Sequence, residues 1–375
     1  MLSSWPPMRC GIGDYASELA PYLVRAGVEL DVVTYDEGAG ETPQMPGVRI
    51  ARTLRRADPP WRVARALREA SPGADVVLVQ SQTFLHPRAF NLFPRFWKGP
   101  PIVAQVHDAP LTPRLLHASI FLRTLYRASS RLVTMSGVTE DALLEQHGVP
   151  PERVVRTPLG VDLARHRPGR SVGARARLGW DEAEVVVLFL GFLNRGKGVF
   201  ELLEGFARAA AARPALRLVF AGEDASAAGV GGTRAQLQTR AEELGVEERV
   251  SFEGFVPRER MASLLANADV VALPYAFSYQ SAVLSRAMAS GAPILASRIE
   301  GFTQWVVDGE SALLVPPRDA PAIAAALARL ADDAPLRARL GDAAAQLAAK
   351  EHGFERTAAN IARVLREAVE LGAER

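Results

Sequence analysis

The sequence has little cysteine and no long apolar segment. Cys10 is its only cysteine, which excludes an internal disulfide framework and a cysteine-based metal site. No apolar run reaches the roughly 20 residues that a helix needs to span a bilayer. The N-terminus also lacks the basic start, the apolar stretch and the small-residue cleavage site of a signal peptide. Together these absences predict a protein of the reducing cytoplasm.

Charge of neither sign dominates the chain. Lys and Arg number 44 and Asp and Glu number 42, which gives a formal net charge of +2. The basic residues are spread along the whole sequence with acidic residues among them, so we interpret most of them as solvated surface. This balance offers no electrostatic case for nucleic acid as the main partner, and we predict none.

The apolar pattern predicts two α/β domains, because 375 residues are too many for one typical hydrophobic core. Short β-branched runs alternate with helical periodicity, which favours parallel sheets covered by helices. The predicted strands are residues 29–35, 75–80, 101–106, 131–135, 153–157, 184–190, 216–221, 249–253, 269–273, 293–297 and 312–315. The predicted helices are residues 61–69, 113–129, 200–212, 234–244, 258–267, 283–290, 319–331, 336–350 and 355–371.

The first residues lack a complete strand. Residues 1–7, MLSSWPP, look like the end of a strand that runs directly into a turn. A first strand would carry several more apolar residues before that point. We therefore expect that the chain as given starts late, from a misassigned start codon or by truncation.

A stretch without periodicity predicts the domain boundary. Proline, glycine and charged residues cluster in 158–162 and 167–170, which is typical of a linker. We therefore predict a Rossmann-like domain at 1–163, a second one at 172–350, and a last segment, 351–375, that is helical. Two doubly wound domains of this kind, facing each other, bind a ligand in the cleft at the C-terminal ends of their strands.

Residues 191–198, GFLNRGKG, form the strongest local motif. The motif follows an apolar strand and precedes a helix, where backbone N–H groups and a cation form an anion site. Its glycines and Lys197 match the nucleotide-triphosphate loop G-x-x-x-x-G-K, but that loop needs Ser or Thr where this chain has Gly198. No apolar strand ends in an Asp placed as a Walker B carboxylate. A basic turn without a ligand also stays open.

Motifs along nearly the whole chain resemble glycosyltransferase family 4, which has the GT-B fold. The resemblance includes residues 6–15, 191–203, 252–257, 268–274 and 307–316. It implies two Rossmann-like domains facing across a cleft, with the last helix crossing back to the first domain. It also implies metal-independent hexosyl transfer from a nucleotide-sugar donor, with retention of configuration and no cofactor. The absence of an Asp-x-Asp motif is consistent with a metal-free site.

The resemblance assigns a basic pair to the donor diphosphate. In the family this pair grips the pyrophosphate beside the glycine that corresponds to Gly191. Lys197 matches the lysine of the pair. The arginine usually follows that glycine directly, where this chain has Phe192, so Arg195 is the nearest substitute. Lys197 and Arg195 are therefore our candidates for stabilising the leaving group.

Four residues of the first half correspond to positions near the donor sugar and the acceptor. Gly11 and Gly13 allow the backbone to approach a ligand closely, although a simple turn explains this glycine pair equally well. His107 follows a buried strand and matches the family's histidine that contacts the transferred sugar, with Asp108 beside it. A purely structural role for His107, capping the next segment, stays open.

The resemblance also includes the loop that holds the nucleotide base through backbone groups. Phe255 and Val256 lie in this loop. Further on, the family usually has two glutamates eight residues apart, which lie by the donor sugar and bind the ribose hydroxyls. This chain has Ser278 and Arg286 at those positions. A cationic donor in place of an acceptor carboxylate should weaken ribose binding.

Some branches of the family carry a Ser-Gln-Ser-Gly type of loop at this place. Tyr279, Gln280 and Ser281 resemble that loop. Their polar groups can take over the contacts of the missing glutamates, and their N–H groups at a helix start can meet the diphosphate. Because the glutamates are missing, a non-catalytic nucleotide-sugar-binding or scaffold protein stays an alternative. A sugar-nucleotide epimerase of GT-B type is the second alternative.

The sequence does not specify the acceptor, the nucleotide of the donor or the oligomeric state. The acceptor can be a glycan, a lipid-linked glycan or a small molecule. Residues 90–98, FNLFPRFWK, mix aromatic and basic residues, as segments at a membrane surface do. Ordinary packing is the favoured interpretation, because this segment is short and broken by proline. A peripheral contact with the inner face of the membrane is the alternative.

Overall fold

The computed structural model describes residues 1–8, 10–37, 41–82, 88–109, 116–166, 173–224 and 232–373. The chain forms two compact units. Unit 1 comprises Met1–Gly160 and Phe354–Arg375, and unit 2 comprises Val161–Gly353. The chain thus passes from one unit to the other within the predicted linker residues 158–162, and the linker residues 167–170 lie outside the described residues.

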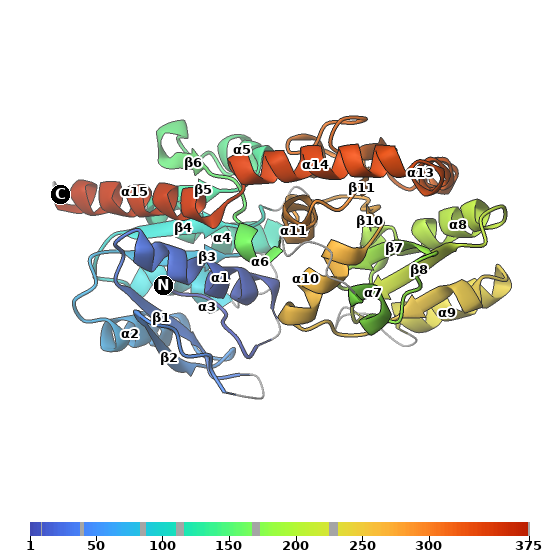
Figure 1. The fold of residues 1–375 in the computed structure, drawn as a ribbon. Coiled ribbons are helices and arrows are strands. Elements are labelled where there is room, and N and C mark those ends of the chain that lie inside the picture. The colour runs from blue at the N-terminus through green and yellow to red at the C-terminus, as the bar shows by residue number, and fades with distance from the viewer. Residues whose placement is uncertain are drawn as a thin grey trace. The chain divides into compact units, whose positions relative to one another are not determined.

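Unit 1 is built around parallel strands (Figure 1). Its helices and strands are α1 (Gly11–Arg25), β1 (Leu30–Tyr35), β2 (Val48–Leu54), α2 (Pro60–Ala70), β3 (Val77–Ser81), α3 (Arg88–Leu92), η1 (Phe93–Phe96), β4 (Ile102–Val106), α4 (Leu116–Ala128), β5 (Ser129–Thr134), α5 (Gly137–Asp141), η3 (Ala142–Gln146), η4 (Pro151–Arg153), β6 (Val154–Arg156) and α15 (Phe354–Ala373).

Residues 1–3 join the strands of unit 1 into one series. Strands β3, β4, β5 and β6 pair in that order, and β1 pairs with β2. Between the two groups, Leu2 forms parallel bridges with Val33 of β1 and Val79 of β3. Its N–H donates to the Leu78 carbonyl at 2.8 Å. The series is therefore β2, β1, residues 1–3, β3, β4, β5 and β6, with the first residues of the chain at its centre.

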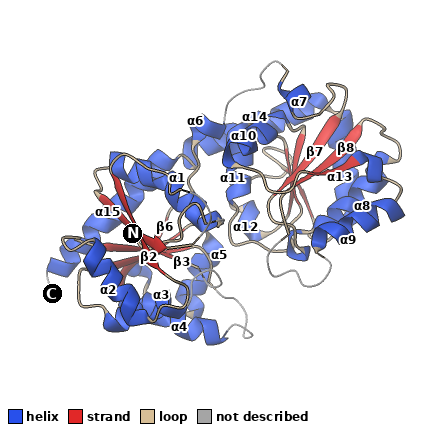
Figure 2. Ribbon diagram, turned by 90° about the horizontal axis from the view of Figure 1, so that it is seen from below, coloured by secondary structure: helices blue, strands red, loops and turns tan. Residues whose placement is uncertain are grey.

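Helices cover both faces of this sheet. Helix α15 packs against α1, β4 and β5, whereas α4 packs against α3 on the other side (Figure 2). The buried apolar side chains of β3 and β4 fill the core between the two layers. Strands buried on both faces are continuous apolar runs, which is why the sequence predicted them within one or two residues.

Unit 2 repeats this architecture around a six-stranded sheet. Its helices and strands are α6 (Leu163–His166), α7 (Ala174–Arg177), β7 (Val185–Leu190), η5 (Arg195–Lys197), α8 (Val199–Ala210), β8 (Leu216–Ala221), α9 (Thr233–Glu243), η6 (Glu247–Arg249), β9 (Val250–Phe252), α10 (Arg258–Asn267), β10 (Val270–Leu273), α11 (Ala282–Ser290), β11 (Ile294–Ser297), α12 (Glu300–Thr303), β12 (Leu313–Val315), α13 (Ala320–Asp332) and α14 (Ala334–Glu351).

The sheet of unit 2 is doubly wound. Its six parallel strands lie in the order β12, β11, β10, β7, β8, β9. Helices α8, α9 and α13 pack together, and so do α10, α11 and α14, which places one helical layer on each face (Figure 2). The chain reverses its direction of winding between β7 and β10, so this is the topological switch point of the sheet. The predicted α/β class with parallel sheets is confirmed.

One strand escaped prediction. Strand β2 pairs only with β1, at the edge of its sheet. Arg49 and Arg52 interrupt its apolar residues, and Arg49 donates two hydrogen bonds to Asp31 of β1 at 2.6 and 2.8 Å. An edge strand carries exposed charge, so its sequence lacks the continuous apolar run that identified the central strands.

None of the described helices is long and apolar enough to cross a membrane.

Candidate functional site

The loops that follow β7 and β10 lie side by side, because these two strands are neighbours at the switch point of unit 2. The Ala276 N–H donates to the Gly196 carbonyl at 2.9 Å, which links the two loops directly. In a doubly wound sheet the crevice at this place is the usual ligand site. The strand order of the sheet thus brings the predicted donor loop 191–198 together with residues 274–281.

Gly198 is required by the contact between these loops. Its φ is +64°, and a Cβ added there would lie 1.9 Å from the carbonyl oxygen of Pro274. Any side chain at this position would therefore displace the backbone that ends β10. The nucleotide-triphosphate loop needs a hydroxyl side chain at this point, and the position of Pro274 excludes one.

Lys197 is held at the start of α8 by its surroundings. Its N–H donates to the Asn194 side chain at 3.1 Å, which caps the turn η5. Its Nζ lies 5.1 Å from the centre of the Tyr275 ring. A Cβ added at Gly191 would lie 2.8 Å from the same Nζ, so glycine leaves room for the ammonium group. Within the described part of the chain, Lys197 forms no ion pair with a carboxylate.

Arg195 is oriented by α8 and α9. Its Nη2 donates to the Gln236 side chain at 2.9 Å, and its guanidinium lies 4.4 Å from the centre of the Phe200 ring. The side chain is exposed. Arg195 and Lys197 therefore share one turn of chain but have different partners. Phe192, which stands where the family usually has arginine, is 42% exposed.

The residues after β10 form a tight turn before α11. The Ser278 hydroxyl donates to the Gln280 carbonyl at 2.8 Å. Ser281 caps α11, because its hydroxyl accepts from the Leu284 N–H at 3.2 Å. Tyr279 makes an edge-on contact with the ring of Phe277. The backbone of this turn packs closely against α12, since a Cβ added at Gly301 would lie 2.0 Å from the Ser278 carbonyl.

Two other predicted donor-binding segments lie elsewhere in unit 2. Arg286 lies one helical turn into α11 and its Nη1 is 3.5 Å from the sulfur of Met261 on α10. Phe255 and Val256 follow the edge strand β9; Phe255 is 45% exposed and Val256 is buried. These segments all follow the C-terminal ends of strands in the same sheet. Among the described residues of the chain, no cluster of three or more His, Cys, Asp and Glu side chains could hold a metal ion.

In unit 1, His107 and Asp108 follow the C-terminal end of β4, and both are buried. His107 Nε2 lies 2.6 Å from the Gln80 side-chain oxygen. The ring of Tyr15 meets the His107 ring edge-on, with centroids 5.4 Å apart. Burial raises the pKa of Tyr15 above its ordinary value, so its hydroxyl stays protonated at neutral pH. The structure therefore places His107 in a buried polar cluster.

Gly11 and Gly13 begin helix α1 in unit 1. A Cβ added at Gly13 would lie 3.1 Å from the backbone of both Ser4 and Trp5, so glycine there permits tight packing of the helix start. A Cβ added at Gly11 would meet nothing within 4 Å. Packing thus explains Gly13 but not Gly11.

Sequence reasoning missed several partners of the predicted residues. Tyr275 lies beside Lys197, and its hydroxyl is buried without a hydrogen-bond partner in the described part of the chain. Asn194 caps the turn that carries Lys197. Gln80 contacts His107, and Gln105 contacts Gln80. The one available signal was a polar or aromatic residue at or just after the end of an apolar strand.

Comparisons with known proteins cover both units. The family model for "Glycosyl transferases group 1" matches residues 173–347, and the model for "Glycosyltransferase Family 4" matches residues 10–165. The D-inositol 3-phosphate glycosyltransferase of Acidothermus cellulolyticus is 30% identical over 389 aligned residues, which cover 96% of this chain and 86% of the relative.

Two solved structures show the same fold. Sucrose-phosphate synthase from Thermosynechococcus elongatus is 21% identical with a TM-score of 0.77, over 96% of this chain and 94% of that one. Anabaena HepE in complex with UDP-glucose is 18% identical with a TM-score of 0.78, over 98% of each chain. The fold and the family matches define a glycosyltransferase with the GT-B fold. The chain belongs to glycosyltransferase family 4.

Proposed function

We propose that this enzyme transfers a hexosyl group from a nucleotide-diphosphate sugar to a hydroxyl acceptor, without a metal ion and with retention of configuration. The observation that carries the proposal is the position of Lys197. Its ammonium group lies beside Gly191 at the switch point of unit 2, without a carboxylate partner in the described residues. A cation at this place suits an anionic ligand at the start of α8.

The chemistry follows from the charge that the reaction develops. Cleavage of the bond between the sugar C1 and the phosphate oxygen leaves negative charge on the diphosphate and positive character on the sugar. Lys197 and the backbone N–H groups at the start of α8 stabilise that negative charge. The acceptor oxygen bonds to C1 from the face that the diphosphate leaves, and its proton passes to the departing phosphate oxygen. Attack from that same face accounts for retention.

The other predicted residues take supporting roles in this proposal. Arg195 adds positive charge near the diphosphate. His107 contacts the transferred sugar, and the first turn of α1, with Gly11 and Gly13, lies near the acceptor. The acceptor itself is a glycan, a lipid-linked glycan or a small molecule.

Thermal shift with a panel of UDP-glucose, GDP-mannose and ADP-glucose tests the donor. One member should raise the melting temperature of the wild type, and turnover of that member should be measurable as release of the nucleoside diphosphate. Lys197→Ala should abolish the shift and lower turnover at least a hundredfold, with an unchanged melting temperature of the free protein. Lys350→Ala is the matched control, because this lysine is 75% exposed. Turnover by Lys197→Ala at the wild-type rate would refute the assignment.

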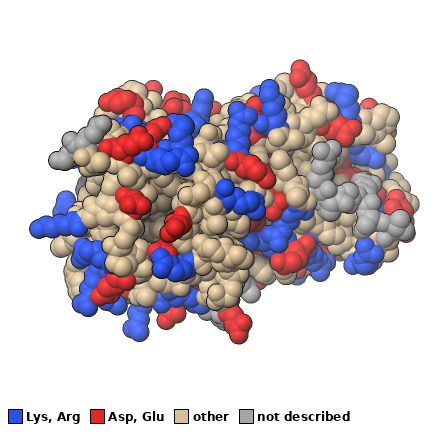
Figure 3. All heavy atoms as spheres, turned by 60° about the vertical axis from the view of Figure 1, so that its left-hand side comes forward, with Lys and Arg blue, Asp and Glu red and all other residues tan. Residues whose placement is uncertain are grey.

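We also propose a peripheral membrane contact, and burial limits which side chains of segment 90–98 can make it. Phe90 and Phe93 are buried in the core of unit 1, so ordinary packing accounts for most of segment 90–98. Phe96 remains 49% exposed on η1, and Trp61 is 51% exposed on α2, which packs against η1. On the face that Figure 3 draws, basic and acidic side chains are interspersed. We propose that these two exposed aromatic side chains make the contact.

Sedimentation with vesicles that contain phosphatidylglycerol tests this contact. The double variant Trp61→Ser, Phe96→Ser should leave the vesicle fraction. Phe277→Ser, which removes an equally exposed aromatic from unit 2, should remain. Absence of the wild type from the vesicle fraction would remove the membrane contact from the proposal.

A further inference from the structure

A chain of buried amide groups leads to His107 in unit 1. Gln105 of β4, Gln80 of β3 and His107 are all buried. The Gln105 Nε2 lies 3.2 Å from the Met135 sulfur and 3.0 Å from the Tyr15 hydroxyl. The Gln80 Nε2 lies 2.8 Å from the Gln105 Oε1, and the Gln80 Oε1 lies 2.6 Å from His107 Nε2.

The thioether of Met135 sets the direction of this chain. A thioether sulfur can only accept a hydrogen bond, so the amide nitrogen of Gln105 must face it. The two N–H groups of Gln105 then donate to the Met135 sulfur and the Tyr15 hydroxyl oxygen, and its own amide oxygen faces Gln80. The opposite orientation would bring the amide oxygen within 3.2 Å of the sulfur, with no hydrogen between two acceptors.

The same reasoning fixes the amide of Gln80. Its nitrogen donates to the Gln105 oxygen at 2.8 Å and also lies 4.0 Å from the sulfur of Met1, which is a second acceptor. Both N–H groups of Gln80 thus have acceptors. The Gln80 oxygen is left to face His107, and an amide oxygen cannot donate. His107 Nε2 must therefore carry a proton.

We infer that Gln80 and Gln105 are positioning residues that hold the neutral ring of His107 in the Nε2–H tautomer. Nδ1 then carries no proton and can only accept a hydrogen bond. The edge-on Tyr15 ring, 5.4 Å away, fixes the ring plane from the side. The consequence for catalysis rests on the proposed function, in which His107 contacts the transferred sugar: a sugar hydroxyl donates to Nδ1.

Nitrogen-15 NMR of the imidazole rings tests the tautomer directly in the full-length protein. Spectra are recorded about two pH units above the ordinary histidine pKa of about 6.5, and a His107→Gln variant identifies the signals of His107. The wild type should show a protonated Nε2 and an unprotonated Nδ1. In Gln80→Leu and in Gln105→Leu, His107 should shift to a mixture of tautomers.

A matched control separates positioning from general loss of packing. Ser129→Ala removes a buried hydrogen bond of 2.8 Å to the Leu125 carbonyl in the same unit, outside the amide chain. It should leave the His107 signals unchanged. A protonated Nδ1 in the wild type, or an unchanged tautomer in Gln80→Leu, would overturn the inference whatever the activity.

Turnover of the donor found by thermal shift links the tautomer to catalysis. Gln80→Leu should lower kcat/KM roughly tenfold to a hundredfold, because small displacements of a substrate contact have effects of this size. A tautomer that changes in Gln80→Leu while kcat/KM stays at the wild-type value would support the amide chain but refute the role of His107 at the sugar.

Discussion

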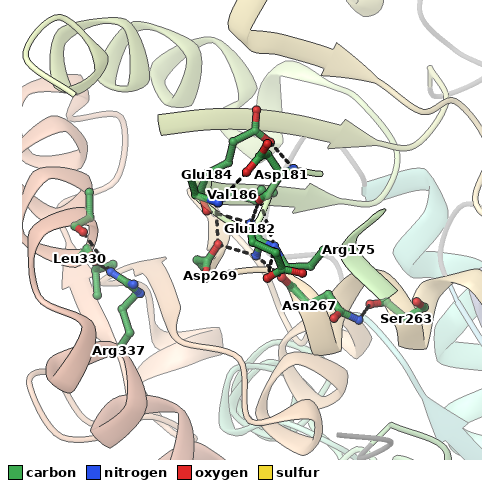
Figure 4. Close-up of polar contacts among 12 residues, drawn as sticks. Arg175, Asp181, Glu182, Glu184, Val186, Ser263, Asn267, Asp269, Leu330 and Arg337 are labelled. Carbon is green, nitrogen blue, oxygen red and sulfur yellow. Dashed lines mark hydrogen bonds and ion pairs between the residues drawn. The ribbon is translucent and has the colours of Figure 1, made fainter. Parts of the chain in front are cut away.

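Arg175 is the clearest place to test how unit 2 is stabilised. Its guanidinium, only 4% exposed, forms an ion pair of 2.9 Å with Asp269, which is 7% exposed (Figure 4). The same group donates to three carbonyls, those of Asp181, Glu184 and Asn267, at 2.8 to 3.0 Å. Asp269 also accepts from the N–H at the start of β7 at 2.9 Å. One side chain thus ties α7 to the N-terminal ends of β7 and β10.

Arg175→Met keeps most of the side-chain volume but removes every donor. Asp269 then stays buried without its cationic partner, and the three carbonyls lose their charged donor. Removal of one member of a buried ion pair costs about 3–5 kcal/mol. At about 2–4 °C per kcal/mol for a unit of this size, the melting temperature of unit 2 should fall by roughly 10 °C.

Hydrogen exchange in increasing urea is the assay, because it follows peptides of the two units separately. Peptides of β7 and β10 should lose protection at lower urea, and peptides of β3 and β4 in unit 1 should not change. The double variant Arg175→Met, Asp269→Leu should cost less than the sum of its single changes, since the second change removes the buried carboxylate that has lost Arg175. A loss below about 1 kcal/mol in Arg175→Met, or additive effects in the double variant, would refute the reasoning.

Three more predictions concern single positions. Gly198→Ala should destabilise unit 2 by about 2 kcal/mol or more in urea unfolding and weaken nucleotide-sugar binding, because its Cβ would meet the Pro274 carbonyl. Gly245→Ala is the control: its φ is also positive, at +65°, but its Cβ would meet nothing within 4 Å. It should lower the free energy of unfolding by only about 1 kcal/mol. Tyr275→Phe should preserve nucleotide-sugar binding and the melting temperature, since it removes only a hydroxyl without a partner in the described residues. Tyr275→Leu removes the ring beside Lys197, so calorimetry should show nucleotide-sugar binding weakened several-fold. His147→Phe should reduce the loss of stability in acid. Burial lowers the pKa of His147 to about 4, so the unfolded chain binds the proton first, and the free energy of unfolding of the wild type falls by about 1–2 kcal/mol between pH 6.5 and 5. Urea unfolding at these two pH values should show no such fall in the variant.

The central strands could be predicted because burial on both faces leaves a plain pattern. Residues 184–190 are almost continuously apolar, and the strand found is Val185–Leu190. Strand β2 could not be recognised in the same way, because Arg49 and Arg52 belong to an exposed edge. The pattern of a chain records burial, so the elements that are least buried are also the least predictable.

In the candidate site, residues with a local sequence pattern were predictable, and residues brought together by strand pairing were not. The sequence singled out Lys197 and Gly198 because a glycine loop between a strand and a helix has a local pattern. It could not single out Tyr275 as a neighbour of Lys197, because that contact depends on β10 lying beside β7 in the sheet. The link from Gln80 to His107 likewise requires the pairing of β3 with β4. The functional roles of the site residues stay predictions until the variants are measured.

The positive charge at the donor loop shows why Lys197 and Arg195 should behave differently. The Arg195 guanidinium donates to Gln236 and lies over the ring of Phe200, and Phe192 adds no charge. Lys197 contributes one unit, and the starts of α8 and α11 contribute about half a unit each, which together approach the two negative charges of a bound diphosphate sugar. Loss of Lys197 removes about half of that sum, whereas loss of Arg195 removes an additional, exposed charge that Gln236 and Phe200 hold. We therefore expect Arg195→Ala to lower nucleotide-sugar affinity several-fold and Lys197→Ala to abolish measurable binding. Equal losses in the two variants would place Arg195 on the diphosphate beside Lys197.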